Sequence, residues 1–260
     1  MKEQLRTLLA AFGLLKSIQK FRNNRQLQSR FVNDFNRFSE SAQRSESRFE
    51  FSWKNRKPYL HDRTSKTGFD RHYVYHPAWA ARILAKTTPE YHVDISSTLY
   101  FCALVSAFIP VRFYDYRPAI LVLEGLTSGS KDLTALDFAD NSVKSLSCMH
   151  TVEHIGLGRY GDPVDYEGDL KAMRELTRVL APGGDLLFVV PVGHKAQIQF
   201  NGHRIYTREL VLQCFKGLHL QEFTLIPECE VDGGLVVNPS ADLLAKQVYG
   251  CGCFWFKKGN

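Results

Sequence analysis

The stretch from Leu136 to Val192 constrains the fold of this chain more than any other. It contains an apolar and small-residue run, Ser142–Met149, which is typical of a buried strand. A predicted helix follows, and its apolar side chains recur at helical spacing: Leu170, Met173, Leu176, Val179 and Leu180. Ala181-Pro182-Gly183-Gly184 ends that helix, because proline cannot continue the hydrogen-bond ladder, and a second apolar run, Asp185–Val192, comes next. Strand, helix and strand in this order predict a βαβ unit with two parallel neighbouring strands.

Apolar runs on either side of this unit extend the alternation of strands and helices. We predict further strands over Tyr91–Ser96, Val111–Tyr116, Leu218–Pro227 and Cys253–Lys257. Helices are predicted over Ala78–Lys86, over Phe101–Phe108 and after the capping residue Thr207. The run Leu121–Gly125 is the candidate for the remaining strand, with a loop over 127–132 behind it. This pattern predicts an α/β fold with a Rossmann-like, doubly wound, seven-stranded sheet, mostly parallel with one antiparallel strand.

Charge separates the chain into two predicted parts. Residues 1–67 hold 15 Lys and Arg against 6 Asp and Glu, a net charge of +9, whereas residues 68–260 hold 18 against 21, a net charge of −3. The first part is predicted to be an N-terminal helical extension, followed from residue 39 by a linker with one short strand or docking segment. The second part is predicted to be the α/β domain. The helix carries two apolar stripes: Leu5, Leu8, Leu9, Phe12, Leu15 and Ile18, then Leu27, Phe31, Phe35 and Phe38.

Two interpretations of the basic helix, residues 1–38, remain open. It lies on an anionic membrane surface or grips a partner protein, or it packs on its own domain or on another protomer. Leu5–Leu15 is too short to span a bilayer, and no signal-peptide cleavage pattern follows it. The six cysteines lie mostly inside apolar runs, which indicates reduced thiols and a cytoplasmic location, with peripheral membrane association as the alternative. Nucleic acid is a disfavoured partner, because no binding module accompanies the basic residues.

Several motifs of the central stretch carry a family resemblance. LDFADNSVKSLSCMHTVEHI, followed by a helix that ends in RVLAPGG, resembles the fourth strand, next helix and fifth strand of class I S-adenosylmethionine-dependent methyltransferases. More narrowly, HTVEHIGLGRYGDP, GDLKAMRELTRVLAPGG and FNGHRIYT resemble the uncharacterised family called domain of unknown function 268. The resemblance extends over about residues 73–258. It implies a class I methyltransferase-like domain with S-adenosylmethionine as its cofactor.

The resemblance also implies a set of cofactor-binding residues, each placed just after a predicted strand. Asp94, Ser96 and Ser97 match the loop that faces the cofactor's amino-acid end, and Asp115 matches the acid that accepts hydrogen bonds from two ribose hydroxyls. Asp132 and Leu133 match the pair beside the adenine, and His150 lies along the sulfonium. The family pattern has glycines in the first loop, whereas this chain has none between Gly68 and Gly125.

Polar residues after the fourth and fifth strands are the candidates for acceptor chemistry. Methyl transfer to oxygen or nitrogen requires alignment and the removal of one proton, which a histidine can take near neutral pH. The predicted catalytic residues are His154 and His203, supported by Glu153 and Tyr206. The predicted substrate contacts are Arg159, Asn201 and Arg204. No metal site is predicted. His150, His154 and His203 have no orienting partners that the sequence reveals, and no other ligand pair with the usual zinc spacing accompanies Cys251 and Cys253.

Three functions compete at this point. The leading hypothesis is a methyltransferase that acts on a small polar or saccharide-like acceptor. The second is a catalytically inactive relative that keeps the fold as a binding or scaffold protein, which the missing loop glycines favour. The third is a nucleic-acid methyltransferase that uses the basic extension as an electrostatic grip.

Overall fold

The computed structural model describes residues 2–46 and 48–260, with side chains described over 16–46 and 48–260. The chain divides into two compact units, residues 1–68 and 69–260. We describe each unit by itself.

The N-terminal unit is one long helix with an aromatic segment folded against it. Helix α1 (Lys2–Gln43) confirms the predicted helix. A short 3₁₀ helix, η1 (Trp53–Asn55), lies in the segment for which a short strand or a docking segment was predicted. Phe35 of α1 has its ring centroid 4.9 Å from that of Phe51 and 4.7 Å from that of Trp53. The apolar stripe predicted over Leu5–Leu15 lies outside the described side chains. Among the described residues, no helix is long and apolar enough to cross a membrane.

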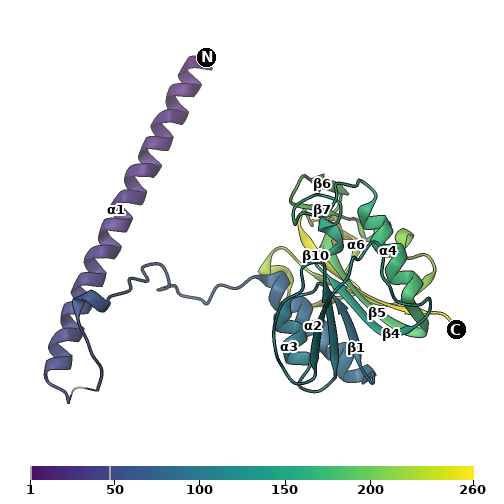
Figure 1. The fold of residues 1–260 in the computed structure, drawn as a ribbon. Helices are drawn as coiled ribbons and strands as arrows, with labels where there is room; N and C mark the ends of the chain where they lie inside the picture. Colours follow the sequence, from purple (N-terminus) through teal and green to yellow (C-terminus); the bar gives the residue numbers. More distant parts are fainter. Residues whose placement is uncertain (1, 47) are drawn as a thin grey trace. The chain divides into compact units, whose positions relative to one another are not determined.

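The larger unit is built on an eight-stranded sheet in the order β3-β2-β1-β4-β5-β10-β8-β9 (Figure 1). Its strands in chain order are β1 (His92–Ile95), β2 (Val111–Asp115), β3 (Leu126–Ser130), β4 (Val143–Met149), β5 (Leu180–Val192), β8 (Leu218–Ile226), β9 (Val236–Val237) and β10 (Gly250–Lys258). The first five strands are parallel, while β10 runs antiparallel to β5 and β8. The mixed, Rossmann-like sheet is therefore confirmed, with one more antiparallel edge strand, β9, than predicted.

Helices cover both faces of this sheet, so that two apolar cores form. The helices of the larger unit are α2 (Arg71–Thr87), α3 (Leu99–Val105), α4 (Gly168–Val179), α5 (Arg208–Cys214) and α6 (Ala241–Ala245). Trp79 and Ile83 of α2 pack with Phe101 of α3 in one core. Met173 and Leu176 of α4 pack in the other. Short elements complete the unit: η2 (Val152–His154), β6 (Gln197–Gln199), β7 (His203–Ile205) and η3 (Glu230–Asp232).

The largest differences from the predicted boundaries concern three elements. The third strand is Leu126–Ser130, whereas Leu121–Gly125 was predicted. Only Leu126 of the strand is buried, so its sequence lacks the apolar pattern from which a strand is predicted. Helix α2 begins at Arg71, where the Asp70 carboxylate accepts a hydrogen bond from Tyr73 N, and it continues through Pro77. Strand β5 includes Pro182-Gly183-Gly184, which passes through an irregularity in its pairing with β4.

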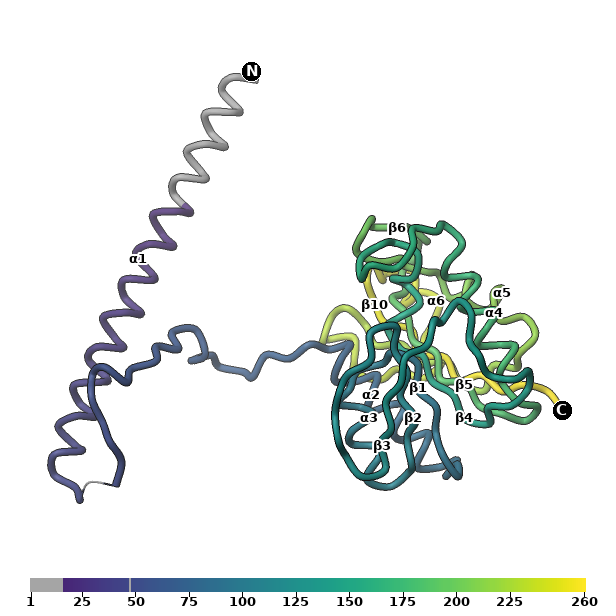
Figure 2. The backbone as a smooth tube through the Cα atoms, in the orientation of Figure 1, coloured from purple at the N-terminus to yellow at the C-terminus, as the bar shows by residue number. Residues whose placement is uncertain are grey.

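The parallel strands bring distant loops together. Because β1, β2, β3 and β4 run in the same direction, the segments that follow them leave the sheet at one edge. Figure 2 traces the backbone of this part of the unit, with β1, β2, β3 and β4 near one another. The predicted site residues after these strands are thus brought into one region.

Candidate active site

A cavity of about 410 Å³ lies at this edge of the sheet. This volume falls in the usual range for small-molecule sites, about 300–1,000 Å³. Its walls come from the ends of β1, β2, β3 and β4, from α2 and from the loop 155–165. The predicted site residues that line it are Ser96, Ser97, Asp115, Asp132, Leu133, His150 and His154.

The loop after β1 is held in place by buried hydrogen bonds. Asp94 is fully buried and accepts hydrogen bonds from Ser97 N, at 2.9 Å, and from the Ser147 hydroxyl. Burial raises the pKa of this carboxyl group, and the hydrogen bonds from Ser147 and Ser97 oppose that shift. Asp94 was predicted to bind the cofactor, but it lies behind the cavity wall. It positions the loop instead.

Ser96 occupies the backbone conformation that a glycine would normally supply. Its φ angle is +58°, in the left-handed region. Its hydroxyl donates to Tyr114 O at 3.3 Å, and Thr151 donates to Ser96 O at 2.9 Å. The glycine-poor loop therefore still makes the tight turn that the methyltransferase pattern makes with glycine.

Two acids follow β2 and β3 on the cavity wall. Asp115 ends β2 and is half-buried, and its Oδ1 accepts a hydrogen bond from Arg117 N at 2.7 Å. Asp132 accepts from Thr134 N, at 2.8 Å, and from the Thr134 hydroxyl, at 2.7 Å. The next residue, Leu133, is buried and contributes an apolar surface to the same wall. A carboxylate beside an apolar side chain suits a ligand that has both hydroxyl groups and a flat ring.

A histidine with a free ring nitrogen faces the cavity after β4. The Nδ1 of His154 donates to Gly202 O at 2.7 Å, so its Nε2 carries the lone pair. That Nε2 lies 3.8 Å from Oε1 of Glu153, a carboxyl group that is only 1% exposed. The carboxyl group would stabilise the positive charge that Nε2 gains with a proton. His154 thus has the geometry of a general base.

Other predicted residues lie outside the cavity wall. Tyr206 is buried and donates to Asp169 Oδ2 at 2.8 Å, and Arg204 is buried and donates to Ile155 O at 2.6 Å. Neither of them lines the cavity, because each is hydrogen-bonded to core contacts that hold α4 and the loop 155–165. Asn201 is exposed at the β6–β7 turn, and Arg159 donates to Gly202 O at 3.1 Å.

His203 and Glu153 stand one layer behind His154. The ring centroids of His203 and His154 are 6.4 Å apart, and the Nε2 of His203 is buried without a partner among the described residues. Burial is the main cause of the lowered pKa of His203, and the nearby His154 adds to it. Glu153 accepts from His150 Nδ1 at 2.7 Å. These two groups can support a base at His154, but they do not line the cavity.

The structure adds residues that sequence reasoning missed. Tyr73 of α2 lines the cavity and stacks on His150, with ring centroids 5.4 Å apart, and burial raises its pKa to about 12. Its neighbour His72 also stacks on His150, with ring centroids 5.2 Å apart. In the sequence only the aromatic run HYVYHP at the start of α2 hinted at this contact. The run meets residues about 80 positions later because of the fold of the sheet, which the local sequence does not reveal.

Comparisons with known proteins agree with this architecture. A model of the family described as "Caenorhabditis protein of unknown function, DUF268" matches residues 125–224. The complex of the Haloferax volcanii Trm112 methyltransferase activator with a protein described as a methyltransferase contains a chain with 18% identity and a TM-score of 0.50. That match covers 73% of this chain and 90% of the other. At this identity the likeness shows the fold.

Two further solved structures have lower scores. A protein of Bacillus halodurans described as a methyltransferase has 16% identity and a TM-score of 0.48, over 71% of this chain and 99% of the other. The N-methyltransferase NodS of Bradyrhizobium japonicum, solved with S-adenosyl-L-homocysteine, has 13% identity and a TM-score of 0.48, over 71% and 86%. No curated protein sequence matches the chain. The chain thus matches the DUF268 family model over residues 125–224, and its larger unit shares its fold with the chain described as a methyltransferase in the Haloferax volcanii complex.

Proposed function

We propose that this protein is an S-adenosylmethionine-dependent methyltransferase whose acceptor is a small polar or saccharide-like molecule. One observation carries the proposal: a cavity of about 410 Å³ brings together the predicted cofactor residues from the ends of β1, β2, β3 and β4. Four segments that are far apart in the sequence supply these residues. The fold shared with the Haloferax volcanii complex supports the same function.

The cavity residues suit the parts of this cofactor. Asp115 offers carboxylate oxygens to a pair of ribose hydroxyls, and Asp132 with Leu133 offers a polar edge and an apolar surface to adenine. The left-handed turn at Ser96 keeps backbone close to the amino-acid end. When bound, the cofactor supplies a methyl group on a positively charged sulfur. His150 and Met149 are the wall nearest to the end of β4, where that group is expected.

His154 is the proposed general base. The bound cofactor would supply its methyl group to an acceptor oxygen or nitrogen, and the acceptor would have to lose one proton. The free Nε2 of His154 takes that proton, while its Nδ1 is held by Gly202 O. Glu153, 3.8 Å from Nε2, stabilises the resulting charge. Tyr160 and Tyr73 line the same cavity and shield the reacting atoms from water.

Calorimetry with S-adenosyl-L-homocysteine and S-adenosylmethionine tests the proposal. We expect one ligand per chain, and Asp115→Asn should weaken binding about 10- to 100-fold, as the loss of charged hydrogen bonds of about 1.5–3 kcal/mol requires. Asp140→Asn is the matched control, because Asp140 is exposed and pairs with Arg178 away from the cavity. Absence of binding at millimolar ligand would remove the proposal. Binding without methyl transfer to any polar acceptor would favour the inactive relative.

A further inference from the structure

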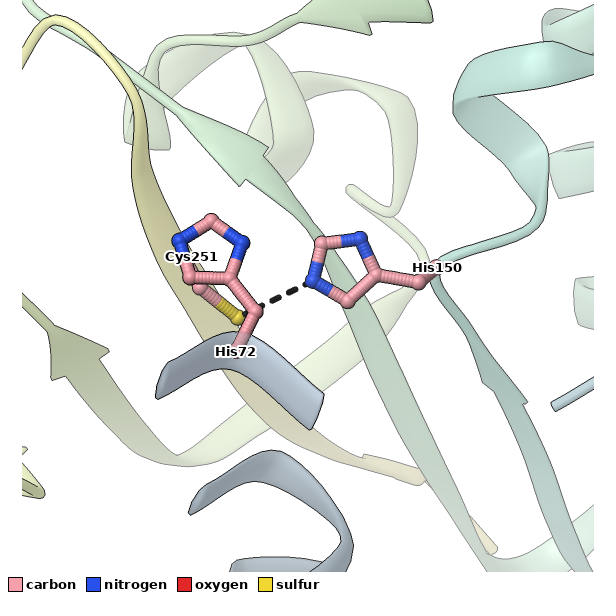
Figure 3. Close-up of side chains that lie close together, drawn as sticks. All are labelled: His72, His150 and Cys251. Atoms are coloured by element: carbon pink, nitrogen blue, oxygen red, sulfur yellow. Dashed lines mark hydrogen bonds between the residues drawn. The ribbon is translucent and has the colours of Figure 1, made fainter. Parts of the chain in front are cut away.

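Three side chains from distant parts of the chain converge behind the cavity wall. His72 lies in α2, His150 follows β4, and Cys251 lies in β10. One potential ligand atom from each lies within 4.8 Å of the other two, and all three residues are buried. Figure 3 shows the two imidazole rings side by side, with the Cys251 sulfur between them and the strand. Two imidazoles and a thiol are a ligand set that transition-metal ions prefer.

The His150 ring is already oriented as metal-binding histidines are. Its Nδ1 donates to Glu153 Oε1 at 2.7 Å, so its Nε2 carries the lone pair and lies 3.4 Å from the Cys251 sulfur. A carboxylate that holds the far nitrogen of a histidine is a recurrent partner in metal sites, because it fixes the tautomer and the ring plane. The other oxygen of Glu153, Oε2, is buried without a partner among the described residues.

Two histidine rings of α2, those of His72 and His76, lie beside the His150 ring. Burial, with the neighbouring His150, lowers the pKa of His72 to about 4, so its ring is neutral near pH 7 and has a nitrogen lone pair. His76 Nδ1 donates to His72 O at 2.6 Å. The Nε2 of His76 is therefore an acceptor, and it is buried without a partner among the described residues. The ring centroids of His76 and His150 are 5.0 Å apart.

We propose that His72, His150 and Cys251 form a binding site for a divalent transition-metal ion with the ligand preferences of Zn²⁺, with Glu153 as the carboxylate that orients His150. Around such an ion the ligand atoms stand about 3.3–3.6 Å apart, given bonds of about 2.0–2.1 Å to nitrogen and 2.3 Å to sulfur. The His150–Cys251 pair is already at that distance. His72 reaches it by a side-chain shift of about 1 Å, from the 4.8 Å limit of the group.

A buried carboxylate, Glu153, lies beside His150 and favours a cation at this point. On binding, the ion displaces the proton of the Cys251 thiol to the solvent and forms a metal–thiolate bond. The two positive charges of the ion then neutralise the negative charges of the Cys251 thiolate and of the buried Glu153 carboxylate. The orphaned Nε2 of His76 is the candidate for a fourth ligand.

The site would fasten one wall of the cavity. It joins the start of α2, the residue after β4 and the central antiparallel strand β10 at a single point. Met149 and His150, which line the cavity, would be fixed by it. The ion therefore acts as a positioning group for the cavity wall, and its presence does not depend on the proposed methyl transfer.

Metal titration of the chelator-treated, reduced full-length chain tests this site. We expect one Zn²⁺ per chain by competition with a chromogenic chelator, and Co²⁺ should give the near-ultraviolet sulfur-to-metal charge-transfer band of a thiolate ligand. Cys251→Ser should abolish that band and weaken Zn²⁺ binding at least 100-fold. Glu153→Gln should keep the band and weaken binding about 10- to 100-fold, as expected for loss of an orienting partner.

Cys214→Ser is the matched control, because Cys214 is a free thiol on α5 outside the three-residue group. It should retain both the band and the affinity. Failure of the wild-type chain to bind either ion overturns the proposal, and so does a band that survives Cys251→Ser. Circular dichroism of each variant establishes that it is folded. Calorimetry with S-adenosyl-L-homocysteine on the same samples reports the proposed cofactor site separately.

Discussion

Ser96 is, with His150, one of the non-glycine residues on the cavity wall that have a strained, left-handed backbone. It is not a glycine, yet its φ angle is +58°, a conformation that costs a residue with a Cβ about 1–2 kcal/mol. Its hydroxyl returns part of that cost by donating to Tyr114 O. The turn after β1 is thus kept by a side chain and its hydrogen bonds, where related folds rely on glycine.

The strain at Ser96 can be measured with two substitutions. Ser96→Ala and Ser96→Gly both remove the hydroxyl, but only the alanine keeps a Cβ at positive φ. We expect the glycine variant to be more stable than the alanine variant by about 1 kcal/mol. Urea unfolding of the two proteins gives the comparison directly. An alanine variant of equal or greater stability would mean that the loop does not hold this conformation.

His92 provides a buried group whose titration should appear in the stability of the fold. Its Nε2 lies 2.8 Å from the Ser147 hydroxyl and its Nδ1 lies 2.7 Å from the Ser145 hydroxyl. Burial lowers its pKa from 6.5 to about 3. Between these values the unfolded chain binds a proton that the folded chain does not, so this contribution to stability is lost as the pH falls below about 6.5.

The pH dependence gives a second prediction. His92 should account for a fall of about 1.4 kcal/mol in the free energy of unfolding for each pH unit below 6. In His92→Asn that share of the slope should vanish, whatever the variant's stability at pH 8. Denaturant unfolding of both proteins at several pH values from 4.5 to 8 is the measurement. Parallel curves would show that His92 titrates alike in the folded and unfolded chains.

The loop 155–165 is an element with its own internal framework. Asp162 Oδ2 accepts a hydrogen bond from Gly156 N at 2.7 Å, and Asp165 N donates to Gly156 O at 2.9 Å. At Gly156 the φ angle is +80°, and an added Cβ would lie 2.0 Å from Asp165 O. The loop can therefore pack in this conformation beside the cavity only because residue 156 has no side chain.

Two glycines of this loop separate crowding from backbone strain. Gly156→Ala should lower stability by more than about 3 kcal/mol, because it combines a backbone clash with an unfavourable φ angle. Gly161 also has positive φ, +84°, but open space surrounds its missing Cβ. Gly161→Ala should then cost only about 1 kcal/mol. Thermal unfolding of both variants distinguishes them, and equal losses would count against the packing of Gly156 on Asp165.

Elements with a strong apolar pattern could be predicted from the sequence, whereas those defined by topology could not. Strand β4 and helix α4 carry regular buried side chains, and their predicted positions agree with the structure to within a few residues. Strand β3 has one buried residue in five, so no pattern distinguished it from a loop. Its place follows from pairing with β2, a contact that local sequence does not record.

The candidate site shows the same division. Residues that directly follow strands, such as Asp115 and His150, could be placed at the cavity because strand ends share one edge. Tyr206 and Arg204 could not be recognised as core residues, because their partners, Asp169 and Ile155, lie 37 and 49 positions away. The group of His72, His150 and Cys251 spans the whole domain. No spacing rule applies to ligands that only the finished sheet brings together.

Over the whole molecule, charge and chemistry are segregated. The cavity and both apolar cores belong to the larger unit, residues 69–260. Residues 68–260 carry a net charge of −3, whereas residues 1–67 carry +9. In α1 the side chains of Leu27, Phe31 and Phe35 are half-buried. Ile18 and Phe21 remain 44% and 69% exposed beside exposed basic residues. A basic surface with exposed apolar side chains is suited to an anionic membrane surface.

We therefore expect the full-length chain to sediment with vesicles that contain phosphatidylserine at low salt and to be released near 1 M salt, where charges are screened within about 3 Å. Each basic residue near the surface contributes about 1 kcal/mol, so replacing Arg22, Arg25 and Arg30 with Gln should weaken binding about 100-fold. The same number of charges removed by Lys→Gln at Lys195, Lys216 and Lys246, all exposed in the larger unit, should have little effect. Equal losses of binding in both triple variants would assign the attraction to the net charge of the chain and not to the basic helix. Binding to neutral phosphatidylcholine vesicles would show that charge is not the cause.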